Sequence, residues 1–308
     1  MPAKEAELTV TKDVTHSVDV ADPESVLAAV KSILEKRYPK RPFRILDRLF
    51  ADVGRLYRGK YPGFHRCETD YHDLQHVLDV TLAFTRLADG YEEEHEGNQC
   101  LGPELCLMGV IAALFHDSGY IRRTADKIHH HGAEYTKVHV SRSAQFMAEY
   151  LPTIGLGHHA DLATKIVHFT GYELSPESIA LQDHRHHVVG ALVGTADVIA
   201  QMADEEYLQK CYQNLYREFE IAGVTKCEDS VGNIQVIYAS PEELLRKTPH
   251  FMRSIVADRL DGYFAGRYRY VESHFDGVNP YMQALHANRR RLEKLLQRPD
   301  AEMLACLG

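Results

Sequence analysis

The strongest constraint on the fold of this chain is an uninterrupted apolar stretch at residues 105–115, followed directly by His116 and Asp117. A helix that is apolar on every side is buried when a protein folds, so this stretch is predicted to be a central core helix. Its end would carry an imidazole and a carboxylate into the interior or onto the floor of a cleft. Because an unpaired buried carboxylate is very costly, Asp117 requires a cation beside it.

Polar side chains also interrupt other apolar segments. Asp197 lies in the middle of the apolar segment 191–202 and needs a partner for the same reason. His72 and His76 are four residues apart, which places both imidazoles on one face of a helix. A single site that collects side chains from these distant segments would remove the cost of burying each of them separately.

The spacing of apolar residues predicts an all-α protein. A helix start is predicted at Asp22, because aspartate is a good N-cap and the following proline suits the first helical position. From there apolar residues recur at steps of three and four. We therefore expect a flexible arm at 1–22 and one helical domain at 23–298, with a metal-site core at about 71–202 and a C-terminal helical pair at about 249–297.

Strands are predicted to be minor, because no long segment alternates cleanly between apolar and polar residues. A short extended piece is expected at residues 231–238. The predicted helices lie at about 23–37, 41–58, 73–88, 103–116, 132–150, 160–170, 187–202, 204–221, 241–247, 249–274 and 279–297.

Composition excludes several classes of function. The 308 residues include 35 Lys and Arg against 44 Asp and Glu, a net charge of −9, which disfavours binding to nucleic acid or to an anionic membrane. The longest apolar run is far shorter than the roughly 20 residues that a bilayer span needs. The six cysteines form no C-x-x-C pair, so we expect reduced thiols and a cytoplasmic location.

The polar side chains of these apolar segments form a plausible metal-ligand set. His76, His116, Asp117 and Asp197 supply two imidazoles and two carboxylates, which suit Zn²⁺, Mn²⁺ or Fe²⁺. Mg²⁺ fits a second position that is richer in oxygen ligands. The expected cofactor is therefore one or two divalent metal ions.

In this order, the four residues resemble the H…HD…D pattern of the HD-domain metal-dependent phosphohydrolase superfamily. Tyr71-His72-Asp73-x-x-His76-Val77 further resembles the Y-H-N-x-x-H-A signature of its cyclic nucleotide phosphodiesterase branch. The resemblance implies an HD-domain helical bundle with additional C-terminal helices. It also implies that His76, His116, Asp117 and Asp197 bind the first metal, that Asp117 bridges to a second, and that His72 protonates the leaving oxygen.

The sequence differs from the phosphodiesterase signature at two positions. Asp73 stands where the signature has asparagine, and Tyr120 stands where it has a second histidine. Some HD proteins hold a second metal with two histidines between the HD pair and the last aspartate. His139 and His168 lie in that interval and are the candidates for this role.

The predicted function is hydrolysis of a phosphodiester, such as a cyclic nucleotide, by a metal-activated hydroxide with His72 as general acid. A bound divalent ion lowers the pKa of its water from about 15.7 toward about 7, and a histidinium can then protonate the leaving group. Arg122, Arg123 and Lys127 follow the HD pair and are candidates for contacting the substrate phosphate.

Three alternatives share this scaffold. The enzyme can be a phosphomonoesterase that acts on nucleotides, which needs the same metal site. It can be a di-iron oxygenase, which needs His139 and His168 as ligands. It can also be a nucleotide-binding regulatory module without turnover. The expected partner is a small phosphate ester, and a homodimer is compatible with the aromatic residues of the C-terminal third.

Overall fold

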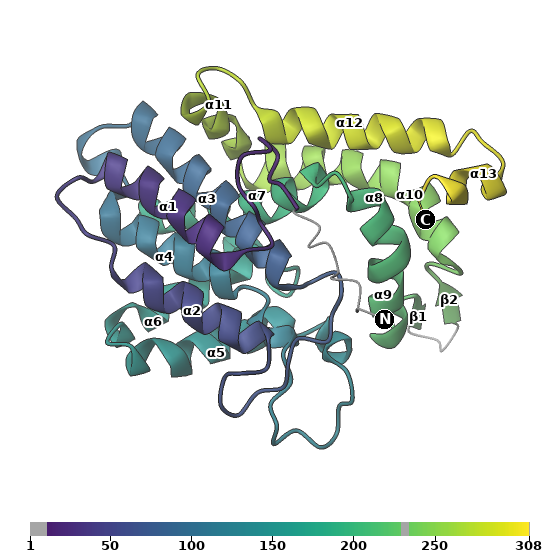
Figure 1. The fold of residues 1–308 in the computed structure, drawn as a ribbon, viewed down its shortest axis with the longest axis horizontal. Coiled ribbons are helices and arrows are strands. Elements are labelled where there is room, and N and C mark those ends of the chain that lie inside the picture. The colour runs from purple at the N-terminus through teal and green to yellow at the C-terminus, as the bar shows by residue number, and fades with distance from the viewer. Residues whose placement is uncertain (1–10, 229–233, 308) are drawn as a thin grey trace, which may run out of the picture.

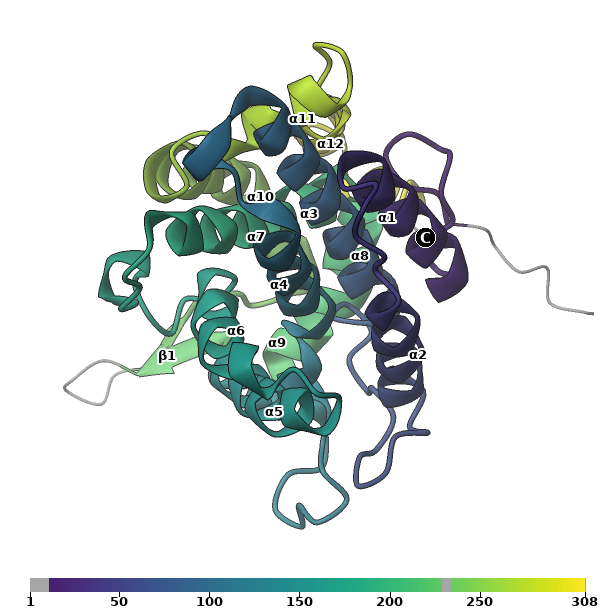
Figure 2. The same ribbon diagram turned by 90° about the vertical axis from the view of Figure 1, so that its left-hand side faces the viewer.

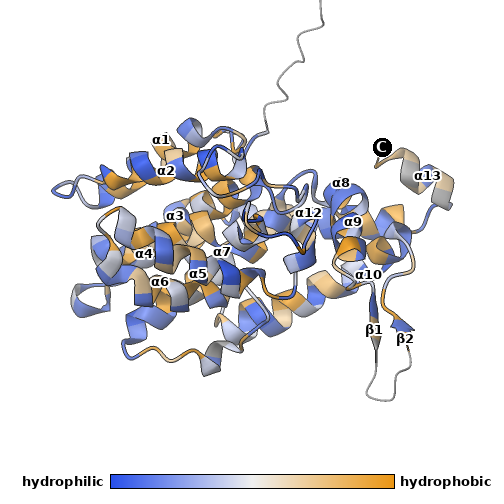
Figure 3. Ribbon diagram, turned by 90° about the horizontal axis from the view of Figure 1, so that it is seen from below, coloured by the Kyte–Doolittle hydropathy of each residue, from blue (hydrophilic) through white to orange (hydrophobic). Residues whose placement is uncertain are grey.

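The computed structural model describes residues 11–228 and 234–307 and confirms the all-α class (Figure 1). The helices are α1 (Pro23–Arg37), α2 (Ile45–Tyr57), α3 (Leu74–Glu94), α4 (Gly102–Phe115), α5 (His139–Thr153), α6 (Ala160–Ile166), α7 (His184–Ala203), α8 (Tyr207–Lys210), α9 (Tyr216–Ile221), α10 (Pro241–Ser254), α11 (Tyr270–His274), α12 (Pro280–Leu295) and α13 (Asp300–Ala305). Two short antiparallel strands, β1 (Lys226–Glu228) and β2 (Ile234–Val236), form a hairpin beyond α9 and α10 (Figure 3).

The centre of the molecule is built from α3, α4 and α7, which pack against one another. Figure 2 shows α4 in the middle of the bundle, and α2, α3, α6 and α7 all contact it. Every residue of α4 from Cys106 to Phe115 is buried, as the apolar stretch predicted. By length and composition alone, Gly97–Tyr120 could cross a membrane. Its burial among the other helices accounts for its apolar character equally well.

Residues 11–22 do not form the predicted flexible arm but pack against the bundle, whereas residues 1–10 lie outside the described part of the chain. The Asp13 carboxylate is buried and accepts the backbone N–H groups of Ser17 and Val18. It also pairs at 2.7 Å with the buried guanidinium of Arg86 on α3. The arm was mispredicted because its anchor is a contact between residues far apart in the sequence.

Replacing Asp13 with alanine is expected to lower the free energy of unfolding by about 3–5 kcal/mol, because Arg86 would be left buried without its counterion. Urea denaturation measures this change. The exposed pair of Lys31 and Asp47 is the control, since Asp47→Ala should cost only about 0–1 kcal/mol. Equal effects of the two substitutions would contradict a stabilising role for the buried pair.

The same pair predicts the direction of a pH effect on stability. Burial disfavours the charge of Asp13, but Arg86 and the surrounding hydrogen bonds outweigh it and lower the pKa from 3.8 to about 2. The folded state therefore binds this proton less readily than the unfolded state. The contribution of Asp13 to stability is complete above pH 3.8 and is lost as the pH falls through about 2.

The C-terminal third departs from the predicted boundaries. Pro249 does not start a helix but lies inside α10, which continues as the π-helical segment Ile255–Tyr263. The chain then turns at Gly266, whose φ of 68° is in the left-handed region that favours glycine. The predicted helix at 249–274 is therefore two pieces.

Other boundaries shift for local reasons. The predicted helix at 132–150 begins only at His139, because a 3₁₀ turn, Gly132–Tyr135, precedes it. Of the extended piece expected at 231–238, residues 234–236 form β2, and 231–233 lie outside the described residues.

Candidate metal centre

Three central helices bring the predicted ligands together. His76 lies in the first turn of α3, whose N-cap Asp73 accepts its backbone N–H at 2.9 Å. His116 and Asp117 directly follow α4. Asp197 lies within α7 and is buried together with them.

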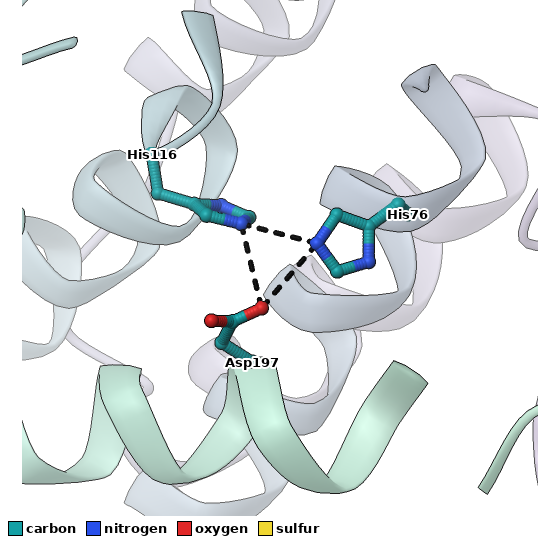
Figure 4. A group of neighbouring side chains, drawn as sticks. All are labelled: His76, His116 and Asp197. Atoms are coloured by element: carbon teal, nitrogen blue, oxygen red, sulfur yellow. Dashed lines mark hydrogen bonds and ion pairs between the residues drawn. The ribbon is translucent and has the colours of Figure 1, made fainter. Parts of the chain in front are cut away.

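The side chains of His76, His116 and Asp197 point toward one another, as Figure 4 shows. The two imidazole Nε2 atoms are 3.2 Å apart. Oδ1 of Asp197 is 3.3 Å from Nε2 of His76 and 3.6 Å from Nε2 of His116. Oδ2 of Asp117 is 3.4 and 3.3 Å from the same two nitrogens.

His76, His116 and Asp197 form a group that could hold a divalent cation, and Asp117 lies against both imidazoles of this group. Zinc ligands at about 2.0–2.1 Å in a tetrahedral arrangement stand about 3.3 Å from one another, close to the spacing here. Nδ1 of His116 donates to the backbone oxygen of Ala113 at 2.8 Å, so Nε2 is the ring nitrogen that faces the cluster and would bind a cation on losing its proton. Oδ2 of Asp117 is buried, yet it accepts no hydrogen bond from the described residues.

The electrostatics of the cluster show how strongly the acids and imidazoles interact. Burial opposes the charging of His116, but the adjacent carboxylates outweigh it and raise the pKa of His116 well above its usual value. Burial likewise opposes ionisation of Asp117 and Asp197, but the imidazoles lower the pKa of both carboxyl groups below the usual range. The carboxylates are therefore ionised at neutral pH and available to a cation.

His139 lies beside the cluster, where a second ion would need a ligand. Its Nε2 is 3.6 Å from Oδ1 of Asp117, and its Nδ1 donates to the backbone oxygen of Thr136 at 2.8 Å. Nε2 therefore has a lone pair facing a carboxylate oxygen, an arrangement that a cation would stabilise. Burial lowers the pKa of His139, which keeps the imidazole neutral and able to bind metal.

His72 and His139 are joined through the ring of Tyr120. Tyr120 stacks on His72 with the ring centroids 4.5 Å apart and on His139 with the centroids 4.4 Å apart. Tyr120 stands where the phosphodiesterase signature has a histidine, and here it serves as a buried spacer between two imidazoles.

The partner of His72 is Glu218, a residue that the sequence did not reveal. Nδ1 of His72 is 2.6 Å from Oε2 of Glu218, and Oε1 accepts the backbone N–H of Tyr71 at 2.6 Å. Burial disfavours the charge of His72, but Glu218 outweighs it and raises the pKa of the imidazole. Glu218 is buried although its helix, α9, has only six residues.

A cavity of about 430 Å³ opens beside these groups. Its wall includes His72, His116, Asp117, His139 and Asp197. The remainder of the wall is mainly apolar and aromatic, and most of it comes from the second half of the chain. It includes Val198, Met202, Leu215, Phe219, Ile237, Leu244, Phe251 and Ile255.

Four of the proposed site residues lie elsewhere. His168 is in a 3₁₀ turn outside the cavity wall, and its buried Nδ1 has no hydrogen-bond partner in the described part of the chain. Arg122 pairs with Glu68, and Arg123 pairs with Glu149. Lys127 donates to a backbone oxygen three residues before it. None of these three cations is among the residues that line the cavity.

Comparison with known proteins places the chain in a family whose model covers some of the site residues. The model of the Npun_R2479-like family matches residues 126–294, more than half of the chain. The matched stretch contains His139, Asp197 and Glu218. No match was found among curated proteins. The chain belongs to the Npun_R2479-like family.

Proposed function

We propose that this protein is a metal-dependent phosphohydrolase that cleaves a phosphodiester, such as a cyclic nucleotide. One observation carries the proposal. Three of the candidate metal ligands, His116, Asp117 and Asp197, line the same cavity as His72, whose Nδ1 is held by Glu218. The resemblance of the ordered ligands to the HD-domain superfamily supports the same reaction.

The four side chains His76, His116, Asp117 and Asp197 would hold the metal ion, with His139 available beside Asp117 for a second. When bound, such an ion lowers the pKa of a ligated water and neutralises phosphoryl oxygens. The helices fix the positions of the ligands before substrate arrives, so little reorganisation is needed during the reaction.

His72 would donate the proton that the leaving oxygen needs. Glu218 occupies Nδ1, so Nε2 is the ring nitrogen left for the substrate. Because Glu218 raises the pKa of His72, the imidazole carries its proton nearer to neutral pH and can act as a general acid. Stacking on Tyr120 and the bond to Glu218 hold the ring in one orientation.

The position of His168 favours hydrolysis over the di-iron oxygenase. That enzyme would need both His139 and His168 as ligands, whereas His168 does not line the cavity. A phosphomonoesterase would use the same centre, and the substrate panel described next separates it from a phosphodiesterase.

The test is a metal-reconstitution assay on the full chain. The protein is stripped with a chelator, reloaded with Mn²⁺, Zn²⁺, Fe²⁺ or Mg²⁺, and assayed with a 3′,5′-cyclic nucleotide, bis-p-nitrophenyl phosphate and a nucleoside monophosphate. Metal-dependent cleavage of a diester would support the proposal. Cleavage of the monophosphate alone would replace it with the monoesterase. Oxygen uptake by a two-iron form, or no turnover with any metal, would refute hydrolysis.

A further inference from the structure

Arg259 is a buried arginine in the wall of the cavity beside the candidate metal centre. It lies in the π-helical segment that extends α10, and only 7% of its surface is exposed. Its Nη2 donates to the backbone oxygens of Phe169 and Gly171 at 2.7 and 2.8 Å. Its Nε is buried and donates to no described group. The guanidinium carbon lies 4.2 Å from the ring centre of Tyr172.

The charge of Arg259 has no counterion within residues 11–228 and 234–307. Lys247, a second cation of the same wall, is half-exposed and pairs with Glu243 at 2.8 Å. A buried cation without a carboxylate is costly, and two backbone oxygens and the rings of Tyr172 and Phe264 offset only part of that cost. An anion entering the cavity would supply the missing counterion.

The arginine is held close to the metal centre by α7. A Cβ atom at Gly194 would lie only 2.5 Å from the Phe169 oxygen that receives Nη2 of Arg259. Gly194 precedes Asp197 by three residues, which is slightly less than one helical turn, or about 4.5 Å along the axis. One small molecule can therefore reach both Arg259 and the metal ligands.

The surface beside these two polar positions is apolar. Val198, Met202 and Ile255 belong to the same cavity wall. A ligand that complements this cavity has one anionic group at the metal ligands, a second at Arg259, and a hydrophobic or aromatic body against the apolar wall. Arginine suits the distal anion because its guanidinium stays charged and can donate a charge-assisted hydrogen bond to a carboxylate or a phosphate through an N–H group that the backbone oxygens do not occupy.

We propose that Arg259 binds a second oxyanion of the substrate. The substrate is then a phosphate ester that also carries a carboxylate or another phosphate group. The oxyanion site follows from the structure alone, whereas the identity of the reacting ester rests on the proposed function. Arg259 is thus a binding residue that selects the substrate and takes no part in bond cleavage.

The test measures anion binding by calorimetry to the metal-stripped full chain, so that no metal ion contributes. The probes are benzoate, phenyl phosphate and benzamide, which is a neutral analogue of benzoate. We expect at least one anion to bind tenfold or more tightly than benzamide. Arg259→Met should abolish this preference, and Arg259→Lys should weaken it at least threefold. Arg253→Met on α10 should leave it unchanged, because Arg253 is exposed and pairs with Glu293.

The outcomes distinguish a carboxylate from a phosphate ligand, and a binding role of Arg259 from a purely structural one. Tighter binding of benzoate identifies a carboxylate, and tighter binding of phenyl phosphate identifies a phosphate. If Arg259 only ties the π-helical segment to residues 169–171, Arg259→Met will lower the melting temperature but leave any anion preference intact. That result would overturn the proposal, as would wild-type protein without an anion preference. If Arg259→Met does not fold, equal binding by wild type and Arg259→Lys refutes it.

A second measurement distinguishes this proposal from the proposed function. With metal restored, Arg259→Met should raise KM at least tenfold for the diester methyl 4-carboxyphenyl phosphate and change KM less than threefold for the diester methyl phenyl phosphate. Anion preference without turnover of any ester would refute the hydrolase and support the oxyanion site. Turnover without anion preference would refute the oxyanion site alone.

Discussion

Asp117→Ala is expected to abolish high-affinity metal binding and, with it, hydrolysis. Asp117 places Oδ2 within 3.4 Å of both ligand imidazoles, and this oxygen is the buried acceptor without a hydrogen bond. Even residues behind the metal ligands typically contribute 10–100-fold to affinity, so loss of a direct ligand should exceed about a hundredfold. Metal content after dialysis, measured by emission spectroscopy, checks this result.

Thermal unfolding provides an independent readout for the same variant. Saturating metal stabilises a folded protein by about 4 kcal/mol at a thousandfold excess over Kd, because the unfolded chain lacks the site. Wild type should therefore melt at a higher temperature with metal, while Asp117→Ala should show little change. Asp161→Ala, on the exposed surface of α6, is the control. An Asp117→Ala protein that kept its full metal content would disprove the assigned ligand set.

His72→Ala is expected to retain metal but to lose turnover by about a hundredfold or more, the usual contribution of general acid catalysis. The substitution leaves all four metal ligands in place. The loss should be large for a cyclic nucleotide, whose alkoxide leaving group needs a proton. It should be much smaller for bis-p-nitrophenyl phosphate, whose phenolate leaves readily without one. Steady-state kinetics on both substrates measure the difference.

Glu218→Gln is the matched variant for this interpretation. It preserves the shape of the side chain but removes the charge that raises the pKa of His72. We expect the same dependence on the leaving group with a smaller loss of rate. An equal loss of activity on both substrates would indicate damage to the metal centre instead, and metal analysis would show it. Equal activity of wild type and His72→Ala, with metal retained, would remove His72 from the mechanism.

Burial arguments located the cluster because its residues break apolar patterns. His116 and Asp117 close a helix that is buried on every side, and Asp197 interrupts another. The cost of burying such groups is visible in the sequence itself. The helical class could also be predicted from the sequence, because the spacing of apolar residues is a local pattern within each helix.

Glu218 and Arg259 could not be found in this way. Glu218 lies on a six-residue helix, and its contact with His72 joins positions 146 residues apart. Arg259 lies in a π-helical segment that no 3.6-residue pattern describes. Sequence proximity to the HD pair could not show that Arg122 meets Glu68 and Arg123 meets Glu149 in the folded chain.

The difference from the phosphodiesterase signature at Asp73 has a structural explanation. Asp73 caps α3 by accepting the backbone N–H of His76. Asparagine and aspartate are nearly equivalent in this role, so either residue can fix the start of the helix that presents His76. The substitution therefore leaves the ligand geometry intact.

Gly194 and Asp197 lie on one uninterrupted helix, α7, so the spacing between them is fixed. The distance between groups seated on it is set by helical rise, which loop movements do not alter. Insertions in the surrounding loops would thus leave the length of an accepted molecule unchanged. A homologue that binds longer or shorter molecules must instead have different side chains along α7, or a contact that lies one helical turn further along it.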